Sequence, residues 1–108
     1  MPELPEVETI RRQLAPYVEG RTIEGVEILD GRATRPESPV DVERELRDAA
    51  VSGLSRSGKY LVMELSDDRY LLMHLRMTGA LLIDPPVEPL HTRVRFRFDG
   101  GGSLLYVD

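Results

Sequence analysis

The sequence contains no cysteine, no tryptophan and only two histidines, His74 and His91. Without cysteine the chain can form no disulfide and offers no thiolate to a metal, and two histidines make a zinc site unexpected. No apolar run approaches the roughly 20 residues that a membrane-spanning helix needs. The N-terminus lacks a basic and then apolar leader, so we expect no signal peptide. These absences predict a chain without a cofactor and without a membrane partner.

The 108 residues are enough for one small domain with one core, so we predict a single domain over residues 1–108. Charged residues are interspersed along the length, which indicates a soluble globular chain. The net charge of −5 argues against a nucleic-acid partner, because affinity for phosphate needs lysine and arginine. The arginines are grouped, however, and net charge is a weak guide to local potential.

The first half of the sequence predicts helix, strand and helix. A helix is expected over residues 3–15, disturbed by Pro16, because apolar residues recur there at helical spacing. Residues 22–29 alternate loosely and suggest a strand, and residues 30–40 carry the glycine and prolines of a loop. A second helix is expected over residues 40–50. The apolar positions of the first helix are Leu4, Val7, Ile10 and Leu14, and the expected cap of the second is Asp41.

After residue 50 the apolar pattern changes to the alternation of short strands separated by turn residues. This layout predicts an α+β fold: an antiparallel β-sandwich or barrel of about seven or eight short strands with two flanking helices. The expected strands of this half are VSGLSRS (51–57), KYLVMEL (59–65), RYLLMHL (69–75), TGALLID (78–84), TRVRFRF (92–98) and SLLYV (103–107).

The opening PELPEVETIRR places a proline directly after the initiator methionine. If that methionine is removed, Pro2 carries a free secondary amine, which can attack an aldehyde-like or acetal-like carbon and form an iminium. A free α-amino group has a pKa of roughly 7.7–8.0 and is partly neutral at physiological pH. Glu3 adjoins this amine and Glu6 lies one helical turn on, so either carboxyl group can transfer protons there.

Two other interpretations of the opening remain open. Early prolines and acidic first turns are ordinary features of a helix start. Tautomerases also use an N-terminal proline, as a general base, but there the proline begins a β-strand, whereas a helix is expected here.

Several later residues have both a structural and a binding interpretation. Lys59 is either a solvated strand end or a functional amine, and His74 is either a core histidine or a binding residue. Met77, between two expected strands and shortly before a glycine, suits an exposed hairpin tip, and Arg76 beside it favours exposure. In TRVRFRF the three arginines alternate with apolar residues, which predicts either a solvated strand face or a phosphate-facing stripe.

PELPEVETIRR closely resembles the N-terminus of bacterial formamidopyrimidine-DNA glycosylases, which are bifunctional base-excision repair enzymes of the Fpg/Nei family. The resemblance covers the whole chain, and PELPEVET points to the branch that acts on oxidised purines such as 8-oxoguanine and formamidopyrimidines. The further segments that agree in order and spacing are GKYL (58–61), HLRMTG (74–79), HTRVRF (91–96) and LLYVD (104–108).

The resemblance implies a Schiff-base mechanism. The amine of Pro2 attacks C1′ of a damaged nucleotide and expels the base, Glu3 acts as proton donor, and Glu6 supports the site. The iminium then permits β-elimination, and usually δ-elimination, which cut the strand. Lys59 matches the family's lysine that contacts phosphate and serves as proton donor in β-elimination.

The resemblance also implies residues that contact DNA. Met77 matches the residue that fills the gap left by the extruded nucleotide, which fits an apolar and flexible side chain. His91 matches a DNA-binding histidine. Arg76, His74 and Arg93 are the remaining candidates; at Arg93 many relatives have a second histidine.

In the family the sequence continues beyond YVD into an arginine-rich segment, a helix–two-turn–helix module and usually a zinc finger. We therefore expect this chain to be an isolated N-terminal catalytic domain, with zinc only in the absent finger. The implied partner is damaged double-stranded DNA and the implied location is the cytoplasm, at the bacterial nucleoid. The full-length family is monomeric, while a dimer is open for this chain. A non-catalytic module that recognises DNA damage is the alternative function.

Overall fold

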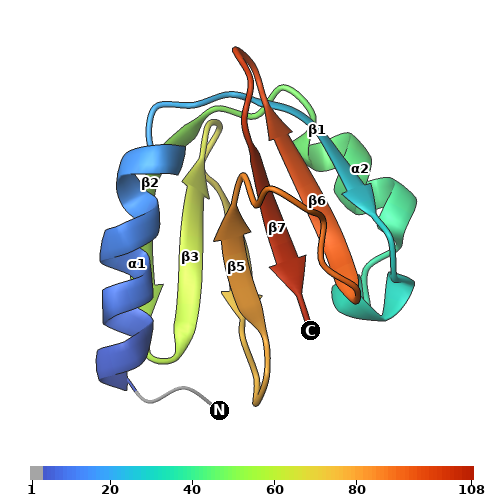
Figure 1. The fold of residues 1–108 in the computed structure, drawn as a ribbon. Helices are drawn as coiled ribbons and strands as arrows, with labels where there is room; N and C mark the ends of the chain where they lie inside the picture. The colour runs from blue at the N-terminus through green and yellow to red at the C-terminus, as the bar shows by residue number, and fades with distance from the viewer. Residues whose placement is uncertain (1–3) are drawn as a thin grey trace. The chain divides into compact units, whose positions relative to one another are not determined.

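The computed structural model describes residues 4–108, and within that span it contains two α-helices, one short 3-10 helix and seven β-strands (Figure 1). All strand pairs are antiparallel, which confirms the predicted α+β class. None of the helices in this span is long and apolar enough to cross a membrane. The elements are α1 (Leu4–Val18), β1 (Ile23–Ile28), η1 (Gly31–Thr34), α2 (Pro39–Leu46), β2 (Val51–Ser57), β3 (Tyr60–Leu65), β4 (Arg69–His74), β5 (Ala80–Ile83), β6 (Thr92–Phe98) and β7 (Ser103–Val107).

The strands form two sheets, and each sheet belongs to one of two compact units of the chain. The first unit joins the chain up to Arg21 with Ala50–Gly79, and it combines α1 with a sheet of order β2-β3-β4. The second unit joins Thr22–Ala49 with Ala80–Asp108, and it combines α2 and η1 with a sheet of order β1-β6-β7-β5. The expectation of a single domain over residues 1–108 stays a prediction.

In the first unit, α1 packs against β2 through the apolar face that the sequence predicted (Figure 1). Val7 and Leu14 are buried on this face. The predicted helix end at residue 15 was wrong, because α1 continues through Pro16 to Val18. Pro16 has no N–H to donate to the carbonyl four residues earlier, but it faces solvent while Val18 is fully buried. Burial of Val18 therefore favours the extra turn despite the missing hydrogen bond.

In the second unit, β6 lies between β1 and β7 and carries much of the core. Val94, Phe96 and Phe98 are buried, which confirms the predicted alternation of this strand. Helix α2 packs on β1, and the Glu43 carboxylate accepts a hydrogen bond from the backbone N–H of Ile28 at 2.9 Å. The packing thus satisfies a backbone donor near the end of β1.

The region between β1 and α2 differs from the prediction in two ways. The expected loop over residues 30–40 contains η1 and the first two residues of α2, which ends at Leu46 rather than at the expected residue 50. The expected cap at Asp41 was wrong, because Ser38 holds the N-cap position and Pro39 begins the helix. Proline suits this first position, since its fixed φ is helical and its missing N–H is not needed. Asp41 instead lies in the first turn and pairs with Arg44 at 2.8 Å.

The burial of β3 and the exposure of β4 give a matched test of the first unit. We expect Leu61→Ala to lower the free energy of unfolding by about 2–5 kcal/mol, because Leu61 is fully buried and its truncation leaves a cavity. Leu72→Ala on the neighbouring strand should cost less than about 1 kcal/mol, since Leu72 is 59% exposed. Denaturant unfolding of the two variants checks this, and equal losses would contradict the assigned core.

Candidate functional site

Of the three residues predicted to act at the opening of the chain, the structure describes Glu6. Pro2 and Glu3 lie outside the described residues, so their assignment stays a prediction. Glu6 lies in the first turn of α1 with an exposed side chain, where the helix dipole favours a carboxylate.

Lys59 is the single lysine of the sequence, and it lies in the two-residue turn that joins β2 to β3. Ser57 pairs with Tyr60 across this turn, and Gly58 adopts a φ of +59°. Tight two-residue hairpins of this kind use a positive φ in the turn, which glycine adopts without strain. The hairpin therefore fixes the backbone that carries the half-buried Lys59.

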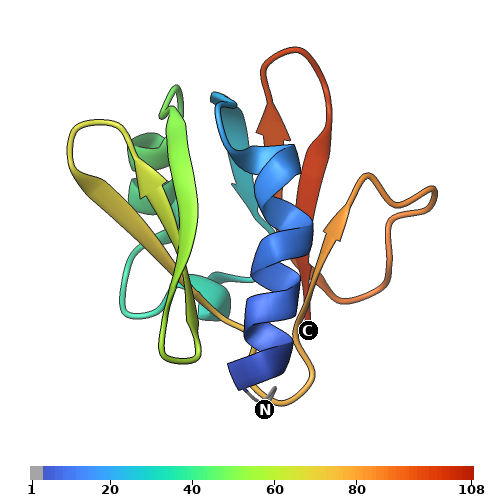
Figure 2. The same ribbon diagram turned by 90° about the vertical axis from the view of Figure 1, so that its left-hand side faces the viewer.

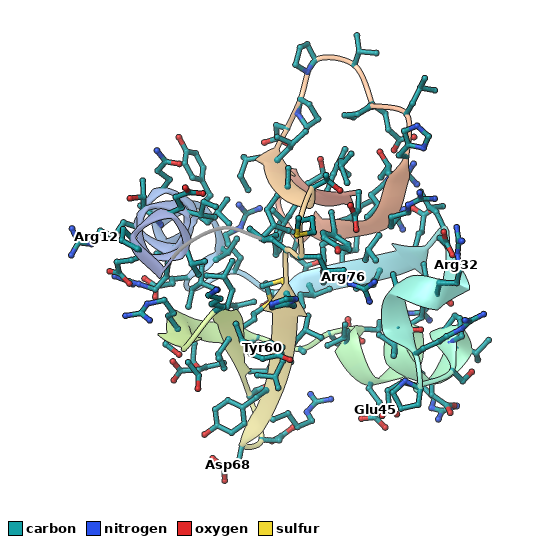
Figure 3. All side chains as sticks on the ribbon, turned by 90° about the horizontal axis from the view of Figure 1, so that it is seen from below. Arg12, Arg32, Glu45, Tyr60, Asp68 and Arg76 are labelled. Atoms are coloured by element: carbon teal, nitrogen blue, oxygen red, sulfur yellow. The ribbon has the colours of Figure 1, made fainter. Side chains whose placement is uncertain are left out.

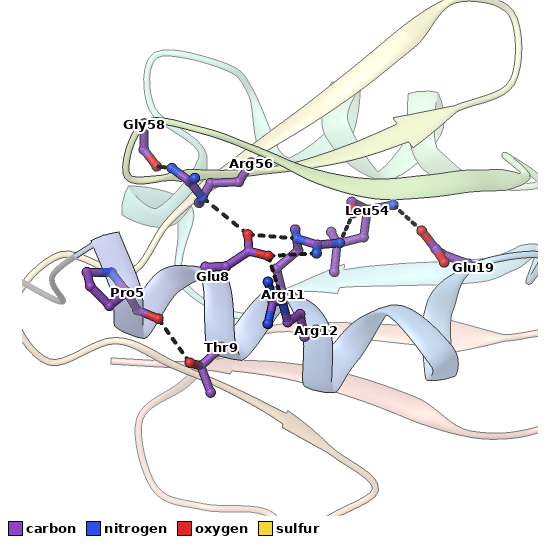
Figure 4. A network of polar contacts seen from close by, with 9 residues as sticks. All are labelled: Pro5, Glu8, Thr9, Arg11, Arg12, Glu19, Leu54, Arg56 and Gly58. Atoms are coloured by element: carbon purple, nitrogen blue, oxygen red, sulfur yellow. Dashed lines mark hydrogen bonds and ion pairs between the residues drawn. The ribbon is translucent and has the colours of Figure 1, made fainter.

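A carboxylate on α1 organises the polar contacts between this helix and β2 (Figure 4). Glu8 accepts two hydrogen bonds from the guanidinium of Arg11, at 3.0 and 2.8 Å, and one from Nε of Arg12 at 2.9 Å. Arg11 also donates from Nη1 to the carbonyl oxygen of Leu54 on β2 at 3.3 Å. The Glu8–Arg11 pair thus links the helix to the strand.

A third arginine extends this network to the lysine turn. Nε of Arg56, on β2, donates to Glu8 Oε1 at 3.3 Å, and its Nη1 donates to the carbonyl oxygen of Gly58 at 3.0 Å. Hydrogen bonds from Arg11 and Arg12, and then from Arg56, lower the pKa of Glu8 from 4.5 to about 2. Glu8 is therefore ionised at any physiological pH, and the network persists there.

His74 lies at the end of β4 and contacts an aromatic ring on the adjacent strand. Its ring centroid lies 4.9 Å from that of Tyr60, with 41° between the ring planes, and the two residues are register partners. His74 is half-buried and Tyr60 is 47% exposed. The side chain is thus neither a fully buried core histidine nor a fully exposed one.

Met77 lies in the segment that follows β4. In Figure 3, Asp68 marks one end of the β3–β4 strand pair, and Arg76 lies beyond the other end. Met77 is 77% exposed and Arg76 is also exposed, so the predicted exposure is confirmed. The predicted hairpin was wrong, because β4 pairs with β3 whereas β5 pairs with β7.

The backbone of this segment is tightly constrained. The N–H of Gly79 donates to the carbonyl oxygen of Leu75 at 2.7 Å, and a Cβ at position 79 would overlap that oxygen. Arg76 adopts a φ of +59°, in the left-handed region that side chains disfavour. The turn therefore presents Met77 on a well-defined backbone.

His91 belongs to the second unit, at the start of β6. The chain between β5 and β6 projects from the sheet as a loop, drawn in orange in Figure 2. His91 ends this loop with an exposed side chain and a φ of +67°. Its carbonyl oxygen accepts a hydrogen bond from the N–H of Asp108 at 3.1 Å. The end of the loop is thus anchored to the chain that follows β7.

The arginines of β6 share one face and are paired with carboxylates. Arg95 contacts Glu27 at 2.8 Å and also Glu88, and these partners raise the pKa of Arg95. Arg97 contacts Glu27 as well, and Glu24 lies 3.9 Å from it. The positive charge of this face is therefore largely compensated, which favours the solvated strand face over the phosphate-facing stripe.

Arg93 is engaged in the same way. Its Nη1 donates to Asp30 at 2.9 Å and its Nε donates to the carbonyl oxygen of Asp108 at 2.9 Å. Hydrogen bonds from Arg32, with a charge contribution from Arg93, hold the pKa of Asp30 well below its usual range. A phosphate contact by Arg93 would have to compete with these partners, so its DNA role stays a prediction.

The network around Glu8 was missed in reading the sequence, although part of it has a sequence signal. Glu8 precedes Arg11 and Arg12 by three and four residues, the spacing at which helical side chains meet. The pairing with Arg56 has no such signal, because 48 residues separate the partners.

Among residues 4–108, no three or more histidine, aspartate and glutamate side chains are grouped so that they could hold a metal ion. The expected absence of a cofactor stays a prediction.

Comparison with known proteins gives one consistent family. The model of the formamidopyrimidine-DNA glycosylase N-terminal domain matches residues 1–108. The formamidopyrimidine-DNA glycosylase of Mycolicibacterium smegmatis is 43% identical over the whole chain, which spans 39% of that protein. The enzyme of that name from Symbiobacterium thermophilum is 46% identical over the whole chain, which spans 36% of it. The chain thus covers well under half the length of these relatives.

Solved structures agree with the sequence relatives. Lactococcus lactis Fpg in complex with FAPY-dG-containing DNA matches 98% of the chain with a TM-score of 0.88 at 38% identity. The same protein with abasic-site DNA matches 99% of the chain with a TM-score of 0.89 at 37% identity. In both cases the match covers 40% of the solved chain. The α+β fold described above is therefore shared with these structures.

The low pKa of Glu8 predicts how the stability of the first unit depends on pH. Glu8 is more acidic in the folded chain than in the unfolded one, so its contribution is complete above about pH 4.5 and is lost as the pH falls toward about 2. We expect the difference in unfolding free energy between the parent chain and Glu8→Gln to shrink over that window. Unfolding measured at several pH values checks this, and a constant difference would contradict it.

Proposed function

The chain belongs to the formamidopyrimidine-DNA glycosylase N-terminal domain family, and we propose that it supplies the catalytic part of a base-excision DNA repair enzyme. The observation that carries this proposal is the match over residues 1–108 to that family, together with the fold shared with proteins solved on damaged DNA. The proposed substrates are oxidised purines in duplex DNA, such as 8-oxoguanine and formamidopyrimidines. The proposed activities are base removal and cleavage at the resulting abasic site.

The proposed chemistry begins at the amine of Pro2. Its lone pair attacks C1′ of the damaged nucleotide, the bond to the base breaks, and Glu3 donates a proton as the sugar ring opens. The amine loses its N–H proton to solvent and the product is an iminium, which makes the C2′ proton acidic. Loss of that proton to solvent forms the C2′=C3′ double bond and breaks the C3′–O bond, so the 3′ phosphate leaves. Lys59 is proposed as the proton donor of this step, and Glu6 as a second acid beside the amine.

The described residues support this assignment through their placement. Glu6 is exposed in the first turn of α1, four residues beyond the proposed nucleophile in sequence. Lys59 is fixed in a tight turn that is hydrogen-bonded, through Arg56, to a carboxylate of the same helix. A proton donor on so constrained a backbone needs little reordering before it acts.

The proposed DNA contacts are Met77, Arg76, His74, His91 and Arg93. Met77 is the best supported, because its apolar side chain is 77% exposed on a constrained turn. In the folded chain most of this apolar side chain stays in water, whereas between unstacked bases it would be buried. Arg93 is the least supported, because its guanidinium is already occupied by Asp30 and Asp108.

A second function is favoured by one observation. The chain spans only 36–39% of the relatives named above, so groups elsewhere in those proteins can be needed for turnover. In that case the chain would recognise damaged or abasic DNA without catalysis. The absence of covalent trapping together with retained binding would identify this alternative.

Covalent trapping tests the proposed nucleophile. With borohydride present, we expect an adduct between the protein and abasic-site or 8-oxoguanine DNA, attached at the N-terminal residue. Pro2→Gly, which retains only a primary amine, should trap far less. Because Lys59 is the single lysine, mass spectrometry of the digested adduct distinguishes the two amines directly. An adduct at Lys59, or none from a methionine-processed protein, would contradict the proposal.

The proposed role of Met77 predicts a selective loss of affinity. Met77→Ala should bind a lesion-containing duplex roughly tenfold more weakly, because its side chain no longer fills the vacated stack. Its thermal stability should stay close to that of the parent, since the residue is largely exposed. Fluorescence anisotropy on lesion and undamaged duplexes measures this. An equal effect on both duplexes would indicate a general contact instead.

A further inference from the structure

The first unit contains a hydrogen-bonded path from α1 to the turn that carries its single lysine. The path runs from the Glu8 carboxylate to Arg56 and from Arg56 to the carbonyl oxygen of Gly58, the residue before Lys59. Figure 4 shows Glu8 between Arg56 on one side and the two arginines of its own helix on the other. The path thus joins the element that follows the proposed nucleophile to the proposed proton donor.

We propose that Glu8 and Arg56 are positioning residues, which set the place of the Lys59 turn relative to the first turns of α1. This inference rests on the proposed function, since it concerns the proton donor of the elimination step. Neither residue is assigned to the chemistry itself. Their contribution is to hold the amine of Lys59 on one side of the sugar while the nucleophile acts from the helix.

The geometry of Arg56 favours this role over a general surface ion pair. Its Nε and Nη1 donate in two directions, to a side chain on the helix and to the backbone of the turn. A planar guanidinium can hold both partners at once, whereas the ammonium of a lysine lacks this fixed fork. Its side chain is 32% exposed and that of Glu8 is 26% exposed, so both ends are partly shielded from water.

The helix end of the path is held independently of the turn. Glu8 is fixed by Arg11, which also bonds the carbonyl oxygen of Leu54, and Glu19 just beyond α1 accepts a hydrogen bond from the N–H of Leu54 at 2.9 Å. Burial of Val7 adds apolar packing. Losing the link to Arg56 should therefore loosen the lysine turn while α1 stays in place.

This arrangement predicts that the two chemical steps separate. In Glu8→Gln and in Arg56→Gln, Schiff-base formation measured by borohydride trapping should stay near the parent rate. Strand cleavage on abasic-site DNA should fall by roughly ten- to a hundredfold, the cost of a misplaced catalytic group. The double variant should lose no more than either single variant, because both remove the same link.

Two further variants serve as controls. Arg12→Gln removes another hydrogen bond to Glu8. Arg12 is 74% exposed, and within residues 4–108 it bonds neither β2 nor the turn. It should leave both steps unchanged. Arg56→Lys keeps the charge but not the fork, so it should rescue little of the cleavage.

An activity-independent measurement keeps this inference separate from the proposed function. Amide hydrogen exchange in the protein should speed up at residues 57–60 in Glu8→Gln and Arg56→Gln, and not in Arg12→Gln. If the parent neither traps nor cleaves, the proposed function fails, and exchange alone then decides whether the pair positions the turn. Unchanged exchange in Glu8→Gln, or an equal fall in trapping and cleavage, would overturn the inference.

Discussion

A single ionised carboxylate organises the polar structure around the candidate site. Glu8 accepts hydrogen bonds from two arginines of its own helix and one of β2, and this arrangement holds its pKa at about 2. Apolar packing brings α1 against β2, but it does not specify how the helix is rotated or how far it slides along the strand. The hydrogen bonds that Arg11 and Glu19 make with Leu54 supply that specification, and the bond from Arg56 to Glu8 ties the lysine turn to the helix.

Charge is used differently in the second unit. There the arginines of β6 face carboxylates from β1 and from the loop after β5, and the pairs neutralise one another. The overall charge of −5 therefore does not arise from a shortage of arginines, but from the acids that accompany them. In the first unit arginines that pair with Glu8 also bond backbone carbonyl oxygens of β2 and its turn, which gives them a structural use that net charge does not reveal.

Local patterns predicted the strands well and the helix ends less well. β2, β6 and β7 begin and end where alternation and glycine turns placed them, because both signals are local. The end of α1 was misplaced, because burial of Val18 outweighs the defect at Pro16. The turn at Met77 was called a hairpin, since the sequence does not reveal that β4 and β5 pair in different sheets. Local patterns could not predict the partners of Arg56 and Arg93 either. Arg56 is 48 residues from Glu8 in sequence, and Arg93 is 63 residues from Asp30.

The exposed turn at Met77 also has a practical consequence. Since the sequence lacks cysteine, a thiol introduced at this position would be the sole site for a maleimide dye in the whole chain. The close approach of Gly79 to the carbonyl oxygen of Leu75 would limit the movement of the backbone that carries the dye. An environment-sensitive fluorophore there would report, by a shift in its emission, whether the turn leaves water when a damaged duplex is added.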